Sequence, residues 1–172
     1  MDRKSKSVNV VHLKLAAAVV IYKDRVLIVR RSNNENFKPG VWGVPCGKID
    51  GRENPTKAVL RELHEETGLN GRVLQFVGTR KFKSYWRGQR AENVQRNYLV
   101  SPEVNRDAVG ENDMPRVDTP EIDQESMWIP VSQIEQVEGL DEHNLATIRQ
   151  GAQASRADRD DNSSAAVSSF RR

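Results

Sequence analysis

The stretch from Gly47 to Leu69 most constrains what this chain of 172 residues can fold into. Its second half predicts one short helix. Asn54 is a favourable N-cap residue, and Pro55 fits the first turn of a helix. Residues 58–66 are mostly good helix formers, and Gly68 suits the left-handed residue that ends many helices.

Three carboxylates share one face of this predicted helix. Glu62, Glu65 and Glu66 stand at positions i, i+3 and i+4, which are neighbours on a helix surface. Like charges at this spacing destabilise a helix, and a hard divalent cation such as Mg²⁺ would compensate them. A solvated acidic face is the alternative, because clusters of charge usually face water.

The spacing around the carboxylates favours the metal site. The pattern G-x5-E-x7-R-E-U-x-E-E-x-G-U, in which U is apolar, is matched at every fixed position from Gly47 to Leu69. This pattern is the Nudix box, and the chain resembles the Nudix hydrolases. The resemblance implies that the family's fold covers about residues 8–150. That fold is an α/β/α sandwich with a central mixed β-sheet, which agrees with the α/β class that the order of strands and helices indicates.

The resemblance also implies roles for the residues of the box. Mg²⁺, with Mn²⁺ as the alternative ion, would be held by Glu62, Glu65, Glu66 and Gly47. The loop that contains Gly47 and Gly51 can bend closely around a diphosphate. Glu53 can accept a hydrogen bond or join the metal shell, and Arg61 would brace the carboxylates because a guanidinium has only donors. The expected catalytic residues are Glu53, Arg61, Glu62, Glu65 and Glu66.

Hydrolysis also needs a general base close to the attacking water. Glu62 is the candidate inside the box. A second group of acids, Glu121, Asp123 and Glu125, precedes a strand expected at residues 126–131, where an ordinary acidic turn is the alternative.

Basic residues gather between positions 80 and 96, with two aromatic residues among them. Such a cluster can clamp phosphates and stack a base, and the same composition suits RNA ends. A solvated edge of the sheet is the alternative. The cluster comprises Arg80, Lys81, Lys83, Arg87, Arg90 and Arg96 with Tyr85 and Trp86.

Two of the expected substrate-binding residues, Tyr85 and Asn144, are assigned from the resemblance. Tyr85 follows Leu69 by 16 positions, a spacing typical of Nudix diadenosine polyphosphate hydrolases, whereas ADP-ribose pyrophosphatases tend to carry proline there. Asn144 resembles the base-reading asparagine of MutT-like enzymes, with helix capping as the alternative. The complete expected set is Arg30, Arg80, Tyr85, Glu125 and Asn144.

The cysteine content and the net charge limit the compartments and partners that are expected for the chain. The single cysteine, Cys46, permits no intramolecular disulfide and favours a reducing compartment. It stands where many Nudix proteins have a glycine, so it is either a small buried residue or a site of oxidation. His12 and Lys14 interrupt the apolar N-terminal run, which alternates like a strand, so we expect no export and a cytoplasmic protein. The net charge of only +3 does not demand a nucleic-acid partner.

The order of elements predicts one domain. Strands are expected at 10–22, 25–31, 41–45, 72–83, 92–100 and 126–131, with loops at 32–40, 84–90 and 101–119. Short helices are expected after the cap residues Ser132 and Asp141, the second ending at about residue 150. Residues 1–8 form a loose N-terminus, 9–150 the domain, and 151–172 a disordered tail with almost no large apolar residue.

These observations predict a Mg²⁺-dependent Nudix hydrolase that cleaves a nucleoside diphosphate linked to a second moiety. The alternatives are a MutT-like pyrophosphatase of ordinary or oxidised nucleoside triphosphates, and a Nudix module that binds a nucleotide with weak catalysis. The expected partner is a nucleotide-type small molecule, without membrane or nucleic acid, and the protein is expected to be a monomer or a homodimer.

Overall fold

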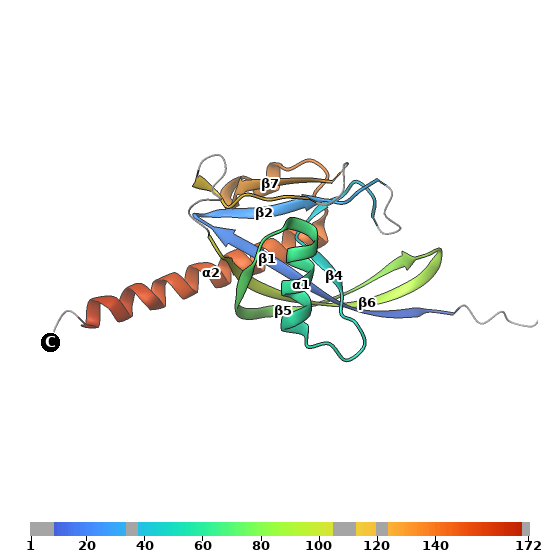
Figure 1. Ribbon diagram of the computed structural model, residues 1–172, viewed down its shortest axis with the longest axis horizontal. Helices are drawn as coiled ribbons and strands as arrows, with labels where there is room; N and C mark the ends of the chain where they lie inside the picture. The colour runs from blue at the N-terminus through green and yellow to red at the C-terminus, as the bar shows by residue number, and fades with distance from the viewer. Residues whose placement is uncertain (1–8, 34–37, 105–112, 120–123, 170–172) are drawn as a thin grey trace, which may run out of the picture.

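The computed structural model describes residues 9–33, 38–104, 113–119 and 124–169, the last with side chains as far as Asp160. Figure 1 shows how its elements are arranged. In chain order these are β1 (Val11–Tyr22), β2 (Arg25–Arg30), β3 (Trp42–Gly43), β4 (Cys46–Lys48), α1 (Pro55–Thr67), β5 (Gly71–Trp86), β6 (Gln89–Pro102), β7 (Glu125–Pro130), the 3-10 helix η3 (Val131–Gln136) and α2 (Glu142–Ser169).

One mixed sheet forms the middle layer. Its strand order is β3-β2-β1-β6-β5, with β4 paired to β1 and β7 paired to β2. Strand β1 runs parallel to β6, and the remaining pairs are antiparallel. Helices α1 and α2 cover opposite faces, so the predicted α/β/α sandwich is confirmed.

Alternation along β1 explains why both faces are covered. Ala16, Ala18 and Val20 pack with α1, whereas Leu15 and Val19 pack with α2. Because successive side chains of a strand point to opposite faces, a strand that is apolar at both sets of positions needs a layer on each side. Strand β1 is therefore the centre of the core.

Two tight turns join the long strands. Lys23 and Asp24 have φ angles of 45° and 58°, and Arg87 and Gly88 have φ angles of 49° and 75°. Two consecutive residues with positive φ form the two-residue hairpin turn that matches the twist of the strands. The predicted loop at 84–90 is therefore wrong: β5 ends at Trp86, β6 begins at Gln89, and only Arg87 and Gly88 form the turn between them.

Two further elements differ from the prediction. The strand expected at 41–45 is shorter, and a separate strand, β4, begins at Cys46 and continues into the box. Pro45 lies between them, and its carbonyl accepts a hydrogen bond from the Ala18 N–H at 2.8 Å. The helix expected after Ser132 is the 3-10 helix η3, which has no side-chain cap.

Helix α2 extends well past the predicted end of the domain. Asp141 caps it as expected, since its Oδ1 accepts a hydrogen bond from the Asn144 N–H at 2.8 Å. The helix then continues to Ser169, beyond residue 151, where the sequence predicts that a tail begins. Gly151 and Ala152 are buried, and small residues of this kind let a helix approach a strand without a large apolar side chain. No helix among the described residues is long and apolar enough to cross a membrane.

Candidate active site

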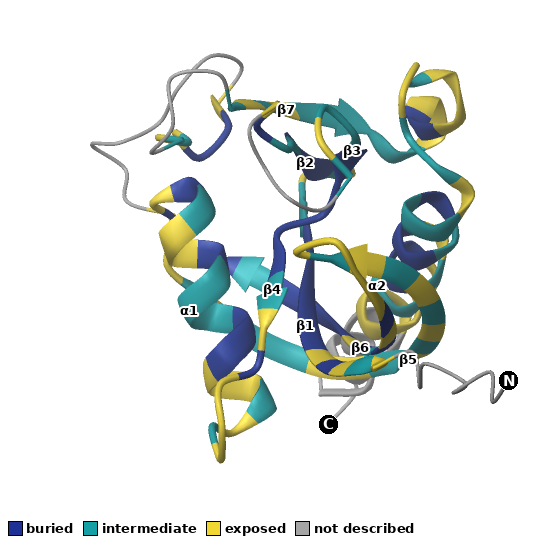
Figure 2. Ribbon diagram, turned by 90° about the vertical axis from the view of Figure 1, so that its right-hand side faces the viewer, coloured by how far each residue is buried: buried dark blue, intermediate teal, exposed yellow. Residues whose placement is uncertain are grey.

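Helix α1 forms as the box predicts and points its acidic face away from the core. Asn54 Oδ1 accepts a hydrogen bond from the Thr56 N–H at 2.9 Å, and Gly68 ends the helix with a φ of 69°. Val59 and Leu63 are fully buried against the sheet. Figure 2 shows the buried and exposed sides of this helix. Burial of the apolar side fixes the rotation of the helix and thereby the position of its glutamates.

Arg61 connects the acidic cluster, which consists of the box residues Glu53, Glu62, Glu65 and Glu66. Its Nε and Nη2 each donate to Glu53 at 2.9 Å, which is the bidentate pair of a guanidinium with a carboxylate. Its Nη1 donates to Glu62 at 2.6 Å and to Glu65 at 3.0 Å. Nη2 also donates to the Lys48 carbonyl at 2.9 Å, so one side chain joins the loop, β4 and α1.

Strand β4 holds the other side of the cluster. The Cys46 N–H donates to Glu66 Oε2 at 3.2 Å. The Glu62 carboxylate lies directly over Gly47, where a Cβ atom would stand only 1.9 Å from Oε2. A side chain at position 47 is therefore incompatible with this position of Glu62, which explains the glycine that opens the box.

The surroundings of Glu53 and Glu62 shift the pKa values of these two carboxyl groups in opposite directions. Hydrogen bonds from Arg61 and from the Asp50 N–H hold the pKa of Glu53 at about 2, well below its ordinary value. Burial raises the pKa of Glu62, because the attraction of Arg61 only partly offsets desolvation. Glu62 thus binds a proton more readily than Glu53 does.

The donor set matches the chemistry of a hard cation. Glu62, Glu65 and Glu66 offer carboxylate oxygens, which are ligands that Mg²⁺ takes, and Glu62 lies against Gly47. Within the described residues, no three acidic, histidine or cysteine side chains are gathered closely enough to form a finished metal site. The Arg61 guanidinium is the cation that bridges Glu62 and Glu65 in this arrangement.

Cys46 has the surroundings of an inert thiol. Its Sγ is buried at 3.7 Å from Gln95 Oε1. Burial raises the pKa of this thiol to about 12, an effect that the charge of Arg31 only partly offsets. Because the thiolate is the reactive form, the small buried residue is the better interpretation and oxidation sensitivity is not supported.

A buried polar row continues from Cys46 across the sheet to α2. Gln95 Oε1 lies 3.1 Å from His143 Nε2, and Gln95 Nε2 donates to Asn97 at 2.8 Å. Burial, followed by the charge of Lys38, lowers the pKa of His143 to about 4. Sequence reasoning missed Gln95 and His143, although the period-2 spacing of Asn93, Gln95 and Asn97 was a usable signal. Beyond His143, a cavity of about 420 Å³ opens, lined by Thr79, Arg80, Lys81, Glu142, His143 and Ala146.

The structure does not gather the five predicted substrate-binding residues in one place. Arg30 Nη1 donates to Glu125 at 3.1 Å, so these two form an ion pair between β2 and β7. The Asn144 side chain donates to Asp141, the cap residue of α2, and also lies over Gly43. Arg80 lines the cavity beside His143.

Tyr85 lies at the tip of the β5–β6 hairpin with 63% of its surface exposed. Strand pairing connects Thr79 with Arg96, Ala16 and Gly47 in one row across the sheet. Tyr85 is six residues further along β5, so it lies far from Gly47. Among the loop acids, Glu121 and Asp123 lie outside the described residues.

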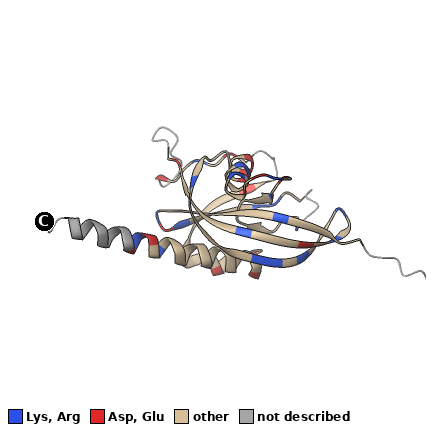
Figure 3. Cartoon of the chain, turned by 90° about the horizontal axis from the view of Figure 1, so that it is seen from below, with Lys and Arg blue, Asp and Glu red and all other residues tan. Residues whose placement is uncertain are grey.

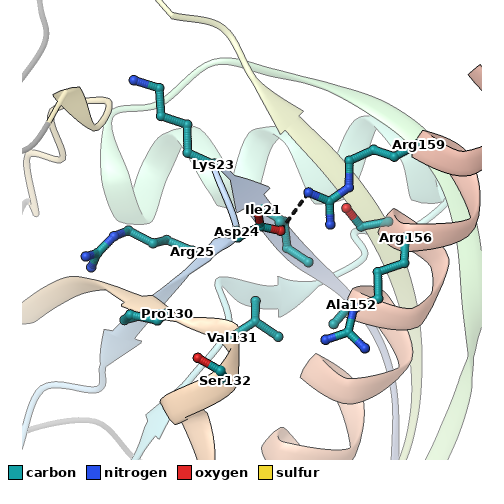
Figure 4. Close-up of a pocket in the computed structure, with 11 residues that line it drawn as sticks. Ile21, Lys23, Asp24, Arg25, Pro130, Val131, Ser132, Ala152, Arg156 and Arg159 are labelled. Atoms are coloured by element: carbon teal, nitrogen blue, oxygen red, sulfur yellow. Dashed lines mark hydrogen bonds and ion pairs between the residues drawn. The ribbon is translucent and has the colours of Figure 1, made fainter. Parts of the chain in front are cut away.

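A second cavity, of about 390 Å³, lies between the β1–β2 turn, η3 and α2. None of the residues of the box lines it. Figure 4 shows Arg159 of α2 directed at Asp24 of the turn, to which its Nη1 donates at 2.6 Å, while Lys23 and Arg25 point away from the helix. The acidic cluster, not this cavity, is therefore the candidate centre of the chemistry.

Comparisons with known proteins agree with this geometry. An RNA pyrophosphohydrolase of Acidiphilium cryptum is 32% identical over 135 residues, which cover 70% of this chain and 76% of that protein. An 8-oxo-dGTP diphosphatase of Proteus vulgaris is 34% identical, over 41% of this chain and 56% of that protein. A MutT protein of Methanosarcina mazei has the same fold, with a TM-score of 0.65 at 19% identity over 87% of this chain and 99% of that one. The family model of the NUDIX domain matches residues 12–150, and the chain therefore belongs to the Nudix hydrolase family.

Proposed function

We propose that this protein is a Mg²⁺-dependent, cytoplasmic enzyme that cleaves the diphosphate bond of a nucleoside diphosphate linked to a second moiety. One observation carries the proposal. Arg61 donates hydrogen bonds to Glu53, Glu62 and Glu65, and the Cys46 N–H donates one to Glu66. All four glutamates of the box are thus held by hydrogen bonds, and the Glu62 carboxylate lies over the glycine that opens the box. Diphosphate hydrolysis is also the general activity of the family.

Each box residue has a proposed role in this reaction. Glu62, Glu65 and Glu66 with the Gly47 carbonyl would hold Mg²⁺ (or Mn²⁺), which supplies charge neutralisation and alignment of a diphosphate. Glu53 acts through Arg61, because both of its oxygens accept hydrogen bonds from that guanidinium. Glu53 and Arg61 are therefore positioning residues.

Glu62 is the proposed proton acceptor among the described acids. Burial raises its pKa, which makes its carboxylate a better base than that of an exposed glutamate. Glu125 is less suited to the role, because it is paired with Arg30. Replacement of each acid by its amide tests the assignment, since loss of the base removes most of the rate and loss of a paired surface acid removes little.

The deciding experiment is hydrolysis across a panel of substrates with Mg²⁺. The panel contains ADP-ribose, diadenosine polyphosphates, NADH, a nucleotide sugar, and ordinary and oxidised nucleoside triphosphates. The name of the A. cryptum relative adds an oligoribonucleotide with a 5′-triphosphate. The double variant Glu65→Gln/Glu66→Gln is the control.

Each outcome of the panel has a defined meaning. Turnover that is lost in the control establishes the enzyme, and the products identify which bond is cleaved. A preference for triphosphates would favour a MutT-like pyrophosphatase. Nucleotide binding without turnover on any member would favour a binding module instead.

A further inference from the structure

A basic face on the sheet has no role in the reaction proposed above. Residues paired across neighbouring strands point to the same side of a sheet, so the strand register defines the face. Lys14 of β1, Val94 of β6 and Lys81 of β5 form one row. The rows on either side and at the hairpin tip add His12, Glu92 and Lys83, then Ala16, Arg96 and Thr79, and finally Arg90 with Tyr85.

The cations of this face differ from several cations elsewhere in the molecule that are paired with acids. Within the described part of the chain, Arg30, Arg61, Arg149 and Arg159 each donate to an acid at 3.1 Å or less. By contrast, the described structure gives no hydrogen-bond or ion-pair partner to the exposed side chains of Lys14, Lys81, Lys83, Arg90 and Arg96. Glu92, the acid of this face, lies 3.7 Å from His12.

The face is open and long enough for an extended ligand. The β5–β6 hairpin projects beyond α1 (Figure 1), and Lys and Arg recur along the long strands of the sheet (Figure 3). From the row of Arg96 to that of Arg90 the strand advances about 20 Å. Side chains on one face of a strand stand about 7 Å apart, a distance comparable with that between successive phosphates of an extended single strand, and Lys81 and Lys83 have this spacing. Exposed Tyr85 at the far end offers a ring on which an unpaired base can stack.

The face also leads to the box. Ala16 is paired with Gly47 on one side and with Arg96 on the other, so Arg96 lies two strands, or about 10 Å, from Gly47 and on the same side of the sheet. We propose that Lys14, Lys81, Lys83, Arg90, Arg96 and Tyr85 bind the phosphodiester backbone of a single-stranded nucleic acid. This inference goes beyond the proposed function, because backbone binding does not require the acids of the box.

Fluorescence anisotropy with labelled oligonucleotides tests the proposal. The probes are single strands of RNA and of DNA of about 12 nucleotides, a length within the site sizes of sheet-based binding folds. Divalent ions are left out so that no probe is cleaved. The variant Lys81→Gln/Lys83→Gln removes two cations from the face. Arg116→Gln/Arg149→Gln is the matched control, because it removes the same charge from exposed positions elsewhere.

The expected effects follow from counterion release. Each phosphate contact with a single strand contributes a slope of about 0.7 in the logarithm of the binding constant against that of salt. Loss of two contacts therefore lowers the slope by about 1.4 and weakens binding about 25-fold at 0.1 M salt. The control variant should retain the slope, and Glu65→Gln/Glu66→Gln should still bind. Tyr85→Ser should weaken the binding of the single-stranded probes about tenfold, because it removes the ring on which a base stacks.

Several results would overturn the proposal. One is no binding of either probe by the unaltered protein at low salt, and another is an equal loss in the face variant and the control. A third is stronger binding to vesicles of anionic lipid than to oligonucleotides, which would assign the face to a membrane surface. Similar binding of RNA and DNA supports recognition of the backbone, and a preference for RNA supports it with a contribution from the 2′-hydroxyl. Circular dichroism of every variant shows whether it is folded.

Discussion

Substitution of Gly47 by alanine tests the geometry of the candidate active site most directly. The added Cβ would lie 1.9 Å from Oε2, 2.0 Å from Cδ and 2.4 Å from Oε1 of Glu62. Ordinary contacts begin near 3.4 Å, so the carboxylate must move by about 1.5 Å. Glu62 cannot move alone, since its Oε1 accepts a hydrogen bond from Arg61 Nη1 at 2.6 Å. The same guanidinium holds Glu53 and Glu65, so displacement of one acid disturbs the others.

The expected loss is large in rate and small in stability. A misplacement of about 1 Å in an active site can reduce a rate about 100-fold, so we expect Gly47→Ala to lower kcat by at least that factor. The groups that must move are the ends of partly solvated side chains and not the core, so the free energy of unfolding should fall by about 1 kcal/mol. Steady-state kinetics on the best substrate of the panel and urea unfolding measure the two quantities.

Two comparisons make this test specific. Gly88→Ala is the control: Gly88 has a φ of 75° and nothing within 4 Å of an added Cβ, so it costs about 1–2 kcal/mol of stability without loss of rate. In a Glu62→Gln background, Gly47→Ala should reduce the rate much less, because the carboxylate it displaces is already absent. Full activity of Gly47→Ala would refute the inferred position of Glu62. If Gly88→Ala lowered the rate by the same factor as Gly47→Ala, the loss would reflect lower stability and not displacement of Glu62.

The remaining predictions concern Arg61, Gly151 and His143. Arg61→Lys keeps the charge, but one ammonium cannot make all the contacts of the guanidinium, so activity should fall on the order of tenfold and the half-saturating Mg²⁺ concentration should rise; a Mg²⁺ titration with both values unchanged would contradict this. Gly151→Ala would place a Cβ 2.4 Å from Val19 Cγ1 in the core, so urea unfolding should show a loss of about 1–3 kcal/mol, and an unchanged midpoint would exclude the packing of α2 on β1. The pKa of His143 is lowered from 6.5 to about 4, so the unfolded chain binds more protons between these values and stability should rise with pH across this window, by about 1–2 kcal/mol for a half-exposed group. Unfolding at several pH values should show this slope in the unaltered protein and a flatter profile in His143→Gln; equal slopes would disprove the assignment.

The parts of the fold that local chemistry determines were predictable from the sequence. Helix α1, its caps and its acidic face follow from short-range rules, and the structure confirms them from Asn54 to Gly68. The tight turn at Lys23 and Asp24 is of the same kind. Strand β4 was not predicted, because it has only three residues and exists through its pairing with β1. The extension of α2 was missed because its buried residues, Gly151 and Ala152, are small.

The same distinction between local and long-range interactions applies to the candidate site. The acids of the box were predictable because their spacing places them on one helix face. The contacts that hold them come from β4, from the loop and from Arg61, and only the structure shows that one guanidinium makes three of them. Gln95 and His143 are 48 positions apart and meet only because β6 and α2 pack together. Pairs of this kind leave no local pattern in a sequence.

Register also changes what the basic residues between positions 80 and 96 imply. In the sequence they form one cluster with Arg80 and Trp86 among them, and the low net charge of +3 gives no reason to expect a nucleic-acid partner. The strand pairing divides this cluster between the two faces of the sheet. Arg80 turns toward His143 and α2, whereas Lys81 and Lys83 join Lys14 of a distant strand. Net charge averages over the molecule, but the field that a ligand meets depends on which cations lack a partner and share a face. A nearly neutral chain can therefore present a surface that suits a polyanion, and the position of this surface beside Gly47 connects it to the site of hydrolysis.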